Sequence, residues 1–228
     1  MKLLLGKTIL ITGATGGLGE SVTAAFVEAG AFVAASARKV DSSSPAQLAV
    51  PADLTTAAGA EEAVRTVLQA RGQLDGVLHI LGGFATDGET QETSEQTWDK
   101  MFALNTKSPF LVFRAALKPM RAAGRGRIIA VGSRAGETAP AGISAYAASK
   151  AAMHTLVQVI AAENKSTGIT ANAVLPSTID TAVNRAAMPG ADFTQWVKPE
   201  SIAGLLVWLA SDASADVSGA LIPVYGKA

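Results

Sequence analysis

Cysteine is absent from this chain of 228 residues, and histidine and tyrosine occur only twice each. The absence of cysteine excludes disulfide bonds, thiolate metal sites and cysteine nucleophiles. His79 and His154 are too few for a histidine-rich metal centre, so we predict no metal site. Aromatic residues are also sparse, at 5% of the chain, whereas apolar residues reach 49%, which is enough for a sizeable core.

An excess of charge of one sign is absent as well, because 19 basic residues balance 19 acidic ones. Nucleic-acid-binding domains usually carry a basic stripe, so we expect no nucleic-acid partner. The apolar beginning "MKLLLGKTILITG" is interrupted by Gly6 and Lys7. No apolar run approaches the roughly 18 residues of a membrane helix, so we expect no membrane partner and a cytoplasmic location.

Short apolar runs alternate with amphipathic helical patterns along the whole chain. This alternation predicts an α/β fold, a doubly wound seven-stranded parallel sheet in three α/β/α layers. No linker or repeat interrupts the pattern, so we expect one domain over residues 1–228, with a loop at 177–198. The predicted strands are 8–13, 31–37, a short one within 47–55, 74–83, 126–133, 169–176 and 219–226, and the predicted helices are 17–30, 56–72, 94–124, 144–168 and 200–212.

The stretch "TGATGGLG" (12–19) joins the first predicted strand to the first helix. Gly13, Gly17 and Gly19 would let backbone N–H groups approach a pyrophosphate at the positive end of that helix. Their spacing differs from the G-x-G-x-x-G dinucleotide fingerprint. A tight turn without a ligand would use the same glycines, so the loop alone leaves both interpretations open.

The stretch "SAYAASKAA" (144–152) places Tyr146 four residues before Lys150, on the same helix face. An adjacent ammonium favours the phenolate, so we predict that it lowers the phenol pKa from its usual value near 10. Such a tyrosine can exchange a proton with a carbonyl or alcohol oxygen. The surrounding alanines keep the helix slim, which leaves room for a coenzyme and a substrate. The bland alternative is a surface tyrosine beside a solvated lysine.

Taken together, "TGATGGLG", "YAASK" and the serine of "VGS" resemble the short-chain dehydrogenase/reductase family, from about Lys7 to Tyr225. The resemblance implies a Rossmann-type fold and four catalytic residues, which are Asn105, Ser133, Tyr146 and Lys150. Ser133 is expected to hold the substrate oxygen, and Asn105 to open its helix around a water that relays protons. A serine hydrolase is excluded because Val131 stands where the G-x-S-x-G motif needs its first glycine.

The same resemblance implies a nicotinamide coenzyme. The second strand ends at Ala37, where an acidic residue would bind the adenine ribose, and Arg38 follows. A basic residue there suits a 2′-phosphate, so we predict NADP (NADPH), with NAD left open. Ser36 would add a hydroxyl. The implied coenzyme contacts are Gly13, Thr15, Gly17, Leu18, Gly19, Arg38, Asp53, Leu54, Gly82, Tyr146, Lys150, Pro176, Ile179 and Thr181.

Two segments depart from the usual family pattern. "HILG" (79–82) stands where relatives carry N-N-A-G, which puts the sheet-bracing role of those asparagines in doubt. "LGGF" (81–84) and the stretch 175–199 are similar to the dihydropteridine reductase branch, yet this chain keeps the serine and asparagine that the branch usually lacks. His79 and His154 are interpreted as ordinary packed residues, the latter at a core or partner surface.

The predicted function is therefore an NADP(H)-dependent oxidoreductase that transfers a hydride between the nicotinamide and a small-molecule carbonyl or secondary alcohol. A quinonoid dihydropteridine reductase is the alternative enzyme. A dinucleotide-binding sensor or scaffold without turnover is the alternative of another class. Family resemblance also implies a homotetramer or dimer, with the helices at 94–121 and 144–164 packed against a partner.

Overall fold

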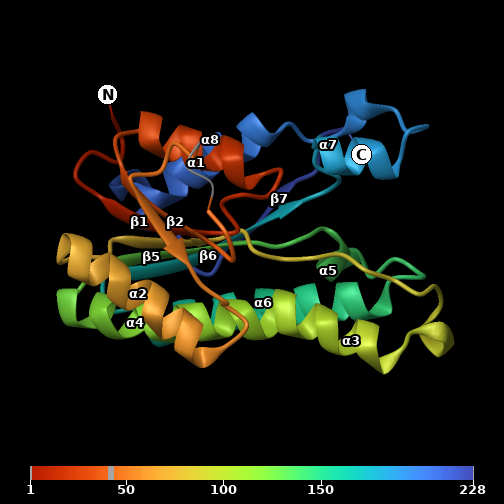
Figure 1. Ribbon diagram of the computed structural model, residues 1–228, viewed down its shortest axis with the longest axis horizontal. Helices are drawn as coiled ribbons and strands as arrows, with labels where there is room; N and C mark the ends of the chain where they lie inside the picture. The colour runs from red at the N-terminus through yellow and green to blue at the C-terminus, as the bar shows by residue number, and fades with distance from the viewer. Residues whose placement is uncertain (1, 41–43, 228) are drawn as a thin grey trace.

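The computed structural model describes residues 2–40 and 44–227. Within them lies a seven-stranded parallel sheet in the order β3-β2-β1-β4-β5-β6-β7, which confirms the predicted doubly wound, Rossmann-type fold (Figure 1). The order reverses beside β1, and ligands of such sheets bind outside the carboxyl ends of the strands at this point. The strands are β1 (Thr8–Thr12), β2 (Phe32–Ala37), β3 (Leu48–Pro51), β4 (Gly76–His79), β5 (Gly126–Val131), β6 (Ile169–Pro176) and β7 (Leu221–Val224).

Helices cover both faces of the sheet, α1 and α8 on one side and α2, α4 and α6 on the other (Figure 1). Residues 2–40 and 44–227 include no helix with the length and apolar character needed to cross a membrane. The helices are α1 (Gly19–Glu28), α2 (Ala57–Arg71), α3 (Glu95–Phe102), α4 (Ser108–Ala123), α5 (Ala135–Thr138), α6 (Ser144–Glu163), α7 (Ala182–Ala187) and α8 (Pro199–Ala210), with short 3-10 turns at Thr90–Glu92, Phe193–Gln195 and Asp212–Ser214.

Each strand contributes side chains to two hydrophobic cores, one on each face of the sheet, because successive side chains of a strand point to opposite faces. On β1, Leu10 packs with the α2, α4 and α6 side. Its neighbours Ile9 and Ile11 pack with the α1 and α8 side, where Phe26 of α1 is fully buried. Both faces of the sheet are therefore covered, as expected for the apolar strands of a parallel sheet.

The helix predicted over 94–124 is continuous but changes its winding in the middle. Ala103–Lys107 forms a π-helical turn, η2, between α3 and α4. Such single π turns occur mostly inside α-helices, often at functional sites. Asn105 lies in this turn, its side chain engaged with the neighbouring loop rather than with solvent. The predicted loop 177–198 also contains structure, since α7 begins after Thr181, whose hydroxyl accepts from the backbone N–H of Asn184 at 3.2 Å.

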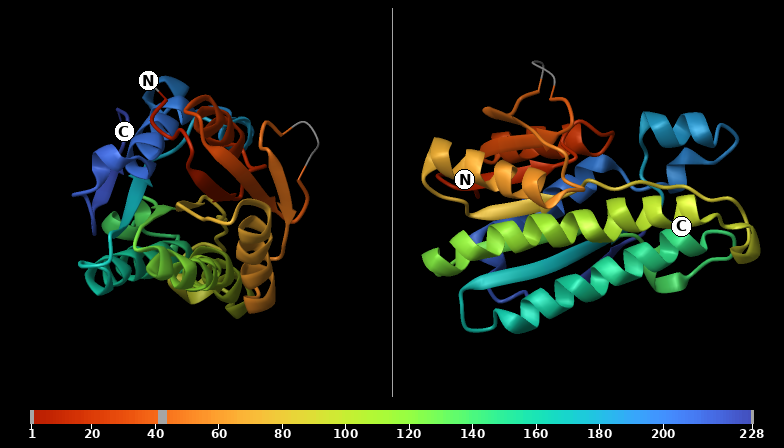
Figure 2. Two further views of the ribbon diagram at one scale, coloured as in Figure 1. Left: turned by 90° about the vertical axis from the view of Figure 1, so that its left-hand side faces the viewer. Right: turned by 60° about the horizontal axis from the view of Figure 1, so that its bottom comes forward.

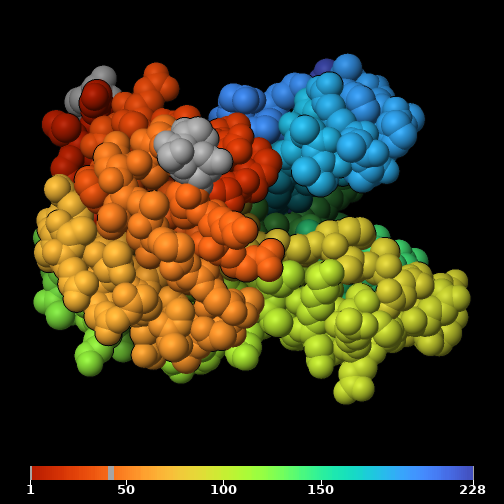
Figure 3. Space-filling model, viewed as in Figure 1, coloured from red at the N-terminus to blue at the C-terminus, as the bar shows by residue number. Residues whose placement is uncertain are grey.

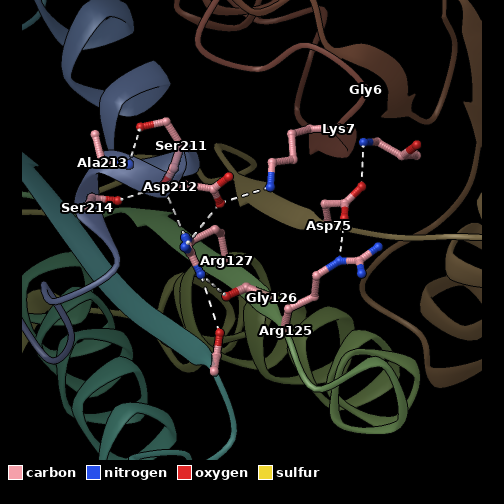
Figure 4. Close-up of polar contacts among 12 residues, drawn as sticks. Gly6, Lys7, Asp75, Arg125, Gly126, Arg127, Ser211, Asp212, Ala213 and Ser214 are labelled. Carbon is pink, nitrogen blue, oxygen red and sulfur yellow. Dashed lines mark hydrogen bonds and ion pairs between the residues drawn. The ribbon is translucent and has the colours of Figure 1, made fainter.

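Charged side chains fasten the amino-terminal edge of the sheet (Figure 4). Asp75 accepts hydrogen bonds from Arg125 Nε at 3.0 Å and from the backbone N–H of Thr8 at 2.8 Å. Arg127 is buried, and its Nε donates to the carbonyl of Ser211 at 3.2 Å. These contacts connect β1, β5 and the end of α8, so this edge has a structural role.

The carboxyl ends of the parallel strands lie at the opposite edge of the sheet. At this end of the sheet, α3 lies alongside α6 (Figure 2). Figure 3 shows this face hollowed between the segment around α7 and the segment around α3. The strand ends and the start of α6 therefore meet at a recess.

Candidate active site

Tyr146 and Lys150 lie one turn apart on α6, and the end of β5 brings Ser133 beside them. The Lys150 ammonium is buried, at 6% exposure, and donates to the carbonyl of Val131 at 3.0 Å. The Ser133 hydroxyl lies close enough to the Tyr146 phenol to lower its pKa. One helix face and one strand end thus bring together three of the four predicted catalytic residues.

Asn105, the fourth, fastens the loop after β4 to α6. Its Nδ2 donates to the carbonyl of Gly83 at 3.0 Å and to Ser149 Oγ at 3.1 Å, while its Oδ1 accepts from the Gly83 N–H at 2.9 Å. A Cβ placed on Gly82 would lie 2.9 Å from Asn105 Oδ1 and 3.3 Å from Lys150 Nζ. Only glycine therefore lets the chain pass between these two side chains.

Burial controls the protonation of the pair. It raises the pKa of the Tyr146 phenol, and the hydrogen bond with Ser133 lowers it less. Burial also lowers the pKa of Lys150 to about 8. The prediction that Lys150 lowers the phenol pKa is therefore wrong for the protein alone, because desolvation disfavours the phenolate and the ammonium donates to Val131 instead. The resting phenol is protonated, which is the form that can donate a proton.

The buried ammonium should cost stability. Because the folded pKa of Lys150 is about 8 and its ordinary value is 10.5, the unfolded chain binds more protons between these values, so stability should rise with pH there. Replacing Lys150 by methionine should raise the free energy of unfolding at pH 7 by on the order of 1–3 kcal/mol, and this gain should fade by about pH 10.5. Urea unfolding at several pH values measures it.

The exposed Lys118 of α4 provides the matched control, since Lys118→Met removes an ammonium that is already solvated. That variant should show no comparable gain in stability at pH 7. A Lys150→Met protein that is less stable than wild type at pH 7 would show that the ammonium is not buried at a cost.

The glycine loop packs tightly against the loop after β4. Gly13 has a φ of +70°, and a Cβ there would lie 2.6 Å from the backbone nitrogen of Leu81. Thr15 and Gly17 are exposed, whereas Leu18 and Gly19 are buried at the start of α1. The backbone of this loop is thus presented at a helix N-terminus, which fits the phosphates of a dinucleotide. Leu18 can contribute only its backbone, because its side chain is in the core.

Thr181 closes the other side of the loop. A Cβ on Gly17 would lie 3.1 Å from Thr181 Cβ, so the two segments touch. Gly17, Thr181 and Lys198 help line a recess of about 450 Å³. Asp180 pairs with Lys198 and, at 2.5 Å, with Arg185, which holds the α7 segment in place. Of the other predicted contacts here, Pro176 ends β6 and Ile179 forms a parallel bridge with Val197.

Arg38 and Asp53 are the charged residues among the contacts predicted for the adenine end. Arg38 is exposed just after β2, close enough to Asp53 to contribute to the lowered pKa of that carboxyl, whose main cause is hydrogen bonding from Thr55. Leu54 is buried in the core, so only its backbone can face a ligand. Ser36 of β2 is fully buried, so the contact suggested between its hydroxyl and the coenzyme is wrong.

His79 replaces the first asparagine of the usual N-N-A-G. It is buried, and its Nδ1 lies 3.0 Å from Thr12 Oγ1. Thr12 on β1 and His79 on β4 are register partners. The imidazole therefore links two neighbouring strands, and its ring packs edge-on against Phe113.

His154 is 2% exposed, which agrees with its interpretation as a packed core residue. Sequence reasoning missed its contact with the turn that carries Ser133. A signal was present in the sequence, because His154 follows Lys150 by four residues and so shares its helix face. Arg134, the residue after Ser133, places its guanidinium 5.0 Å from the ring centre of Tyr225.

The chain matches the profile described as short chain dehydrogenase over residues 7–191. It belongs to this family. The cyclic-di-GMP-binding biofilm dispersal mediator protein of Escherichia coli K12 is 32% identical, covering 99% of this chain and 98% of the relative. The 2-(S)-hydroxypropyl-CoM dehydrogenase 3 of Xanthobacter autotrophicus is 30% identical, covering 98% and 96%. The solved short-chain dehydrogenase/reductase of Serratia marcescens is 30% identical with a TM-score of 0.89, covering 99% and 100%.

As a short-chain dehydrogenase, the chain is an oxidoreductase of a family that binds NAD(P) and acts on alcohol or carbonyl groups of small molecules. The family assignment agrees with the glycine loop at the start of α1 and with the groups gathered at the ends of β4 and β5.

Proposed function

We propose that this short-chain dehydrogenase is a single coenzyme-binding domain that interconverts a carbonyl and a secondary alcohol with NADP(H). The observation that carries the proposal is the convergence of Ser133, Tyr146 and Lys150 beside Asn105 at the carboxyl edge of the sheet. A dimer or tetramer is also proposed, supported by large apolar side chains exposed on α3, α4 and α6, namely Trp98, Phe110 and Val159.

A nicotinamide bound at this site would supply or accept the hydride. In reduction, Tyr146 donates its phenolic proton to the substrate oxygen as charge develops there. Because its pKa is raised, the Tyr146 phenol is protonated at neutral pH and can donate this proton. Ser133 donates a hydrogen bond to the same oxygen, which fixes the carbonyl beside the phenol. The positive charge of Lys150, one turn along α6, stabilises the phenolate that forms when Tyr146 gives up its proton. Asn105 holds the Gly82–Gly83 backbone against this site.

The proposal is tested with a panel of ketones, aldehydes, 3-oxoacyl thioesters and secondary alcohols, monitored by nicotinamide absorbance with both coenzymes. We expect coenzyme oxidation that matches alcohol formation mole for mole with at least one carbonyl class. Tight coenzyme binding without turnover of any compound would contradict it.

Arg38 should determine the preference for NADP(H). Its guanidinium can pair with a 2′-phosphate, and a charge-assisted hydrogen bond is worth about 1.5–3 kcal/mol. Arg38→Ala should therefore raise KM for NADPH by roughly tenfold or more while changing KM for NADH by less than about twofold. Steady-state kinetics with both coenzymes measures this, with Lys165→Ala as an exposed control remote from β2. An equal change for both coenzymes would refute the role of Arg38.

Reduction of a quinonoid dihydropterin is a second candidate, favoured by the position of Phe84. This ring is 61% exposed and meets the Tyr146 ring edge-on at 5.0 Å between centroids. A flat heterocycle could stack on it. Ser133→Ala should hardly affect pterin reduction, whereas carbonyl reduction should fall, so this variant separates the two substrates.

Regulatory dinucleotide binding without turnover is a candidate of another class, favoured by the full-length similarity to a cyclic-di-GMP-binding protein. A sensor needs no phenol, ammonium and serine gathered at one point, which supports the enzyme instead. Calorimetric titration with cyclic di-GMP, NADPH and NADH distinguishes these ligands.

A further inference from the structure

The imidazole of His154 lies beneath the turn that carries Ser133, and the proposed chemistry gives it no role. The backbone N–H of Ser133 donates to His154 Nε2 at 3.4 Å. On the other side of the ring, His154 Nδ1 lies 3.1 Å from Glu137 Oε1 on α5. The ring therefore contacts Ser133 in the turn before α5 and Glu137 in α5 itself, while its own backbone belongs to α6.

Two glycines fit the chain around this ring. A Cβ on Gly132 would lie 2.5 Å from His154 Nε2, and one on Gly136 would lie 2.5 Å from His154 Cε1. A real Cβ atom does not lie this close to another heavy atom, so a side chain at either glycine would displace the imidazole or the backbone. The "GSRAG" segment (132–136), which forms the turn after β5, therefore packs directly against the imidazole.

The hydrogen bonds define one tautomer. A backbone N–H can only donate, so His154 Nε2 must be the acceptor, and the ring proton must be on Nδ1, directed at the Glu137 carboxylate. The charged groups that face the ring are Glu137 from α5 and Lys150 from α6. Burial lowers the pKa of His154 more than Glu137 raises it, which keeps the ring neutral as this arrangement requires.

We propose that His154 is a positioning residue, which holds the Ser133 turn against α6 through its Nε2 acceptor while Glu137 fixes its tautomer. The proposal rests on the proposed role of Ser133. His154 stands on the same helix as Tyr146 and Lys150. The imidazole thus sets the place of the serine relative to the phenol, although it touches neither substrate nor coenzyme.

The tautomer is measured first, because this readout does not depend on activity. The chain has only two histidines, so ring ¹⁵N spectra can be assigned with a His79→Gln variant. We expect His154 to carry its proton on Nδ1 near neutral pH, with Nε2 as an acceptor. An Nε2–H tautomer for His154 would overturn the proposal, whatever reaction the protein catalyses.

Two amide variants then separate the ring nitrogens in the full-length protein. His154→Gln can place an acceptor where Nε2 stands, whereas His154→Asn can replace only Nδ1. The expected result is a kcat within about threefold of wild type for the glutamine variant and lower by roughly tenfold for the asparagine variant, with KM for the coenzyme unchanged. Gln158→Asn, on an exposed position one turn along α6, serves as the control truncation.

A double-mutant cycle shows whether the effect acts through the serine hydroxyl. In a Ser133→Ala background, His154→Asn should cost almost nothing further, because there is no hydroxyl left to position. Equal losses in both backgrounds, or equal losses for the two amides, would overturn the proposal. If His154→Asn does not fold, Glu137→Leu and Glu137→Gln replace it, with loss of kcat expected for leucine and rescue for glutamine. If wild type turns over no carbonyl, the proposed function fails while the tautomer result still stands.

Discussion

Replacing Tyr146 by phenylalanine is expected to lower kcat for carbonyl reduction by about 10³-fold, because the variant lacks the proton that the substrate oxygen must receive. The ring itself remains, so its edge-on packing against Phe84 should persist. Coenzyme affinity should change little, since the glycine loop and Arg38 are untouched. Turnover by absorbance and NADPH affinity by fluorescence titration measure the two effects on the same preparation.

The only other tyrosine supplies the matched control. Tyr225 lies beyond β7 with its ring beside the Arg134 guanidinium, outside the proposed chemistry. Tyr225→Phe should keep kcat within about twofold of wild type, which is far below the effect of losing a general acid. A Tyr146→Phe variant that retains a tenth of the wild-type rate would refute the assignment of the acid.

Gly19→Ala is expected to destabilise the fold by about 3 kcal/mol or more and to abolish dinucleotide binding. The added methyl would overlap the carbonyl oxygen of Gly13 and lie 2.6 Å from the carbonyl carbon of Ala14. Both are backbone atoms, so no side-chain rotation relieves the clash, and the loop before α1 must move. Thermal unfolding and NADPH titration measure the two losses.

Gly16, in the same loop, has room for a side chain. A Cβ there would meet Gly13 O at 3.5 Å, which is ordinary van der Waals contact. Gly16→Ala should therefore change the free energy of unfolding by less than about 0.5 kcal/mol. Similar destabilisation by both substitutions would show that the loop is not packed as described.

The order of strands and helices was predictable because two local signals coincide. Apolar runs of strand length alternate with helical periodicity, and glycines mark the ends, as Gly72 does with its left-handed φ of +70° after α2. The π turn around Asn105 was not predictable from periodicity, because five residues of altered winding do not disturb an apolar helix pattern. Likewise α7 is short and mostly exposed, so it lacks a buried face that would mark it in the sequence.

The candidate site was predictable where spacing alone carries the information. Tyr146 and Lys150 share a face because they are four residues apart on one helix. The direction of their pKa shifts was not predictable, because it depends on burial, which arises from the packing of separate segments around α6. The contact between His154 and Ser133 was not predictable for the same reason. The two residues are 21 positions apart in sequence and meet only when β5 and α6 pack together.

The most direct test of the central claim is a crystal structure with NADPH bound. We predict that the pyrophosphate lies at the glycine loop and that the nicotinamide ring occupies the recess at the carboxyl edge of the sheet, with the Tyr146 hydroxyl facing it beside Ser133. A nicotinamide bound elsewhere, or a Tyr146 hydroxyl directed away from the ring, would contradict the proposal that this tyrosine is the general acid of a hydride-transfer enzyme.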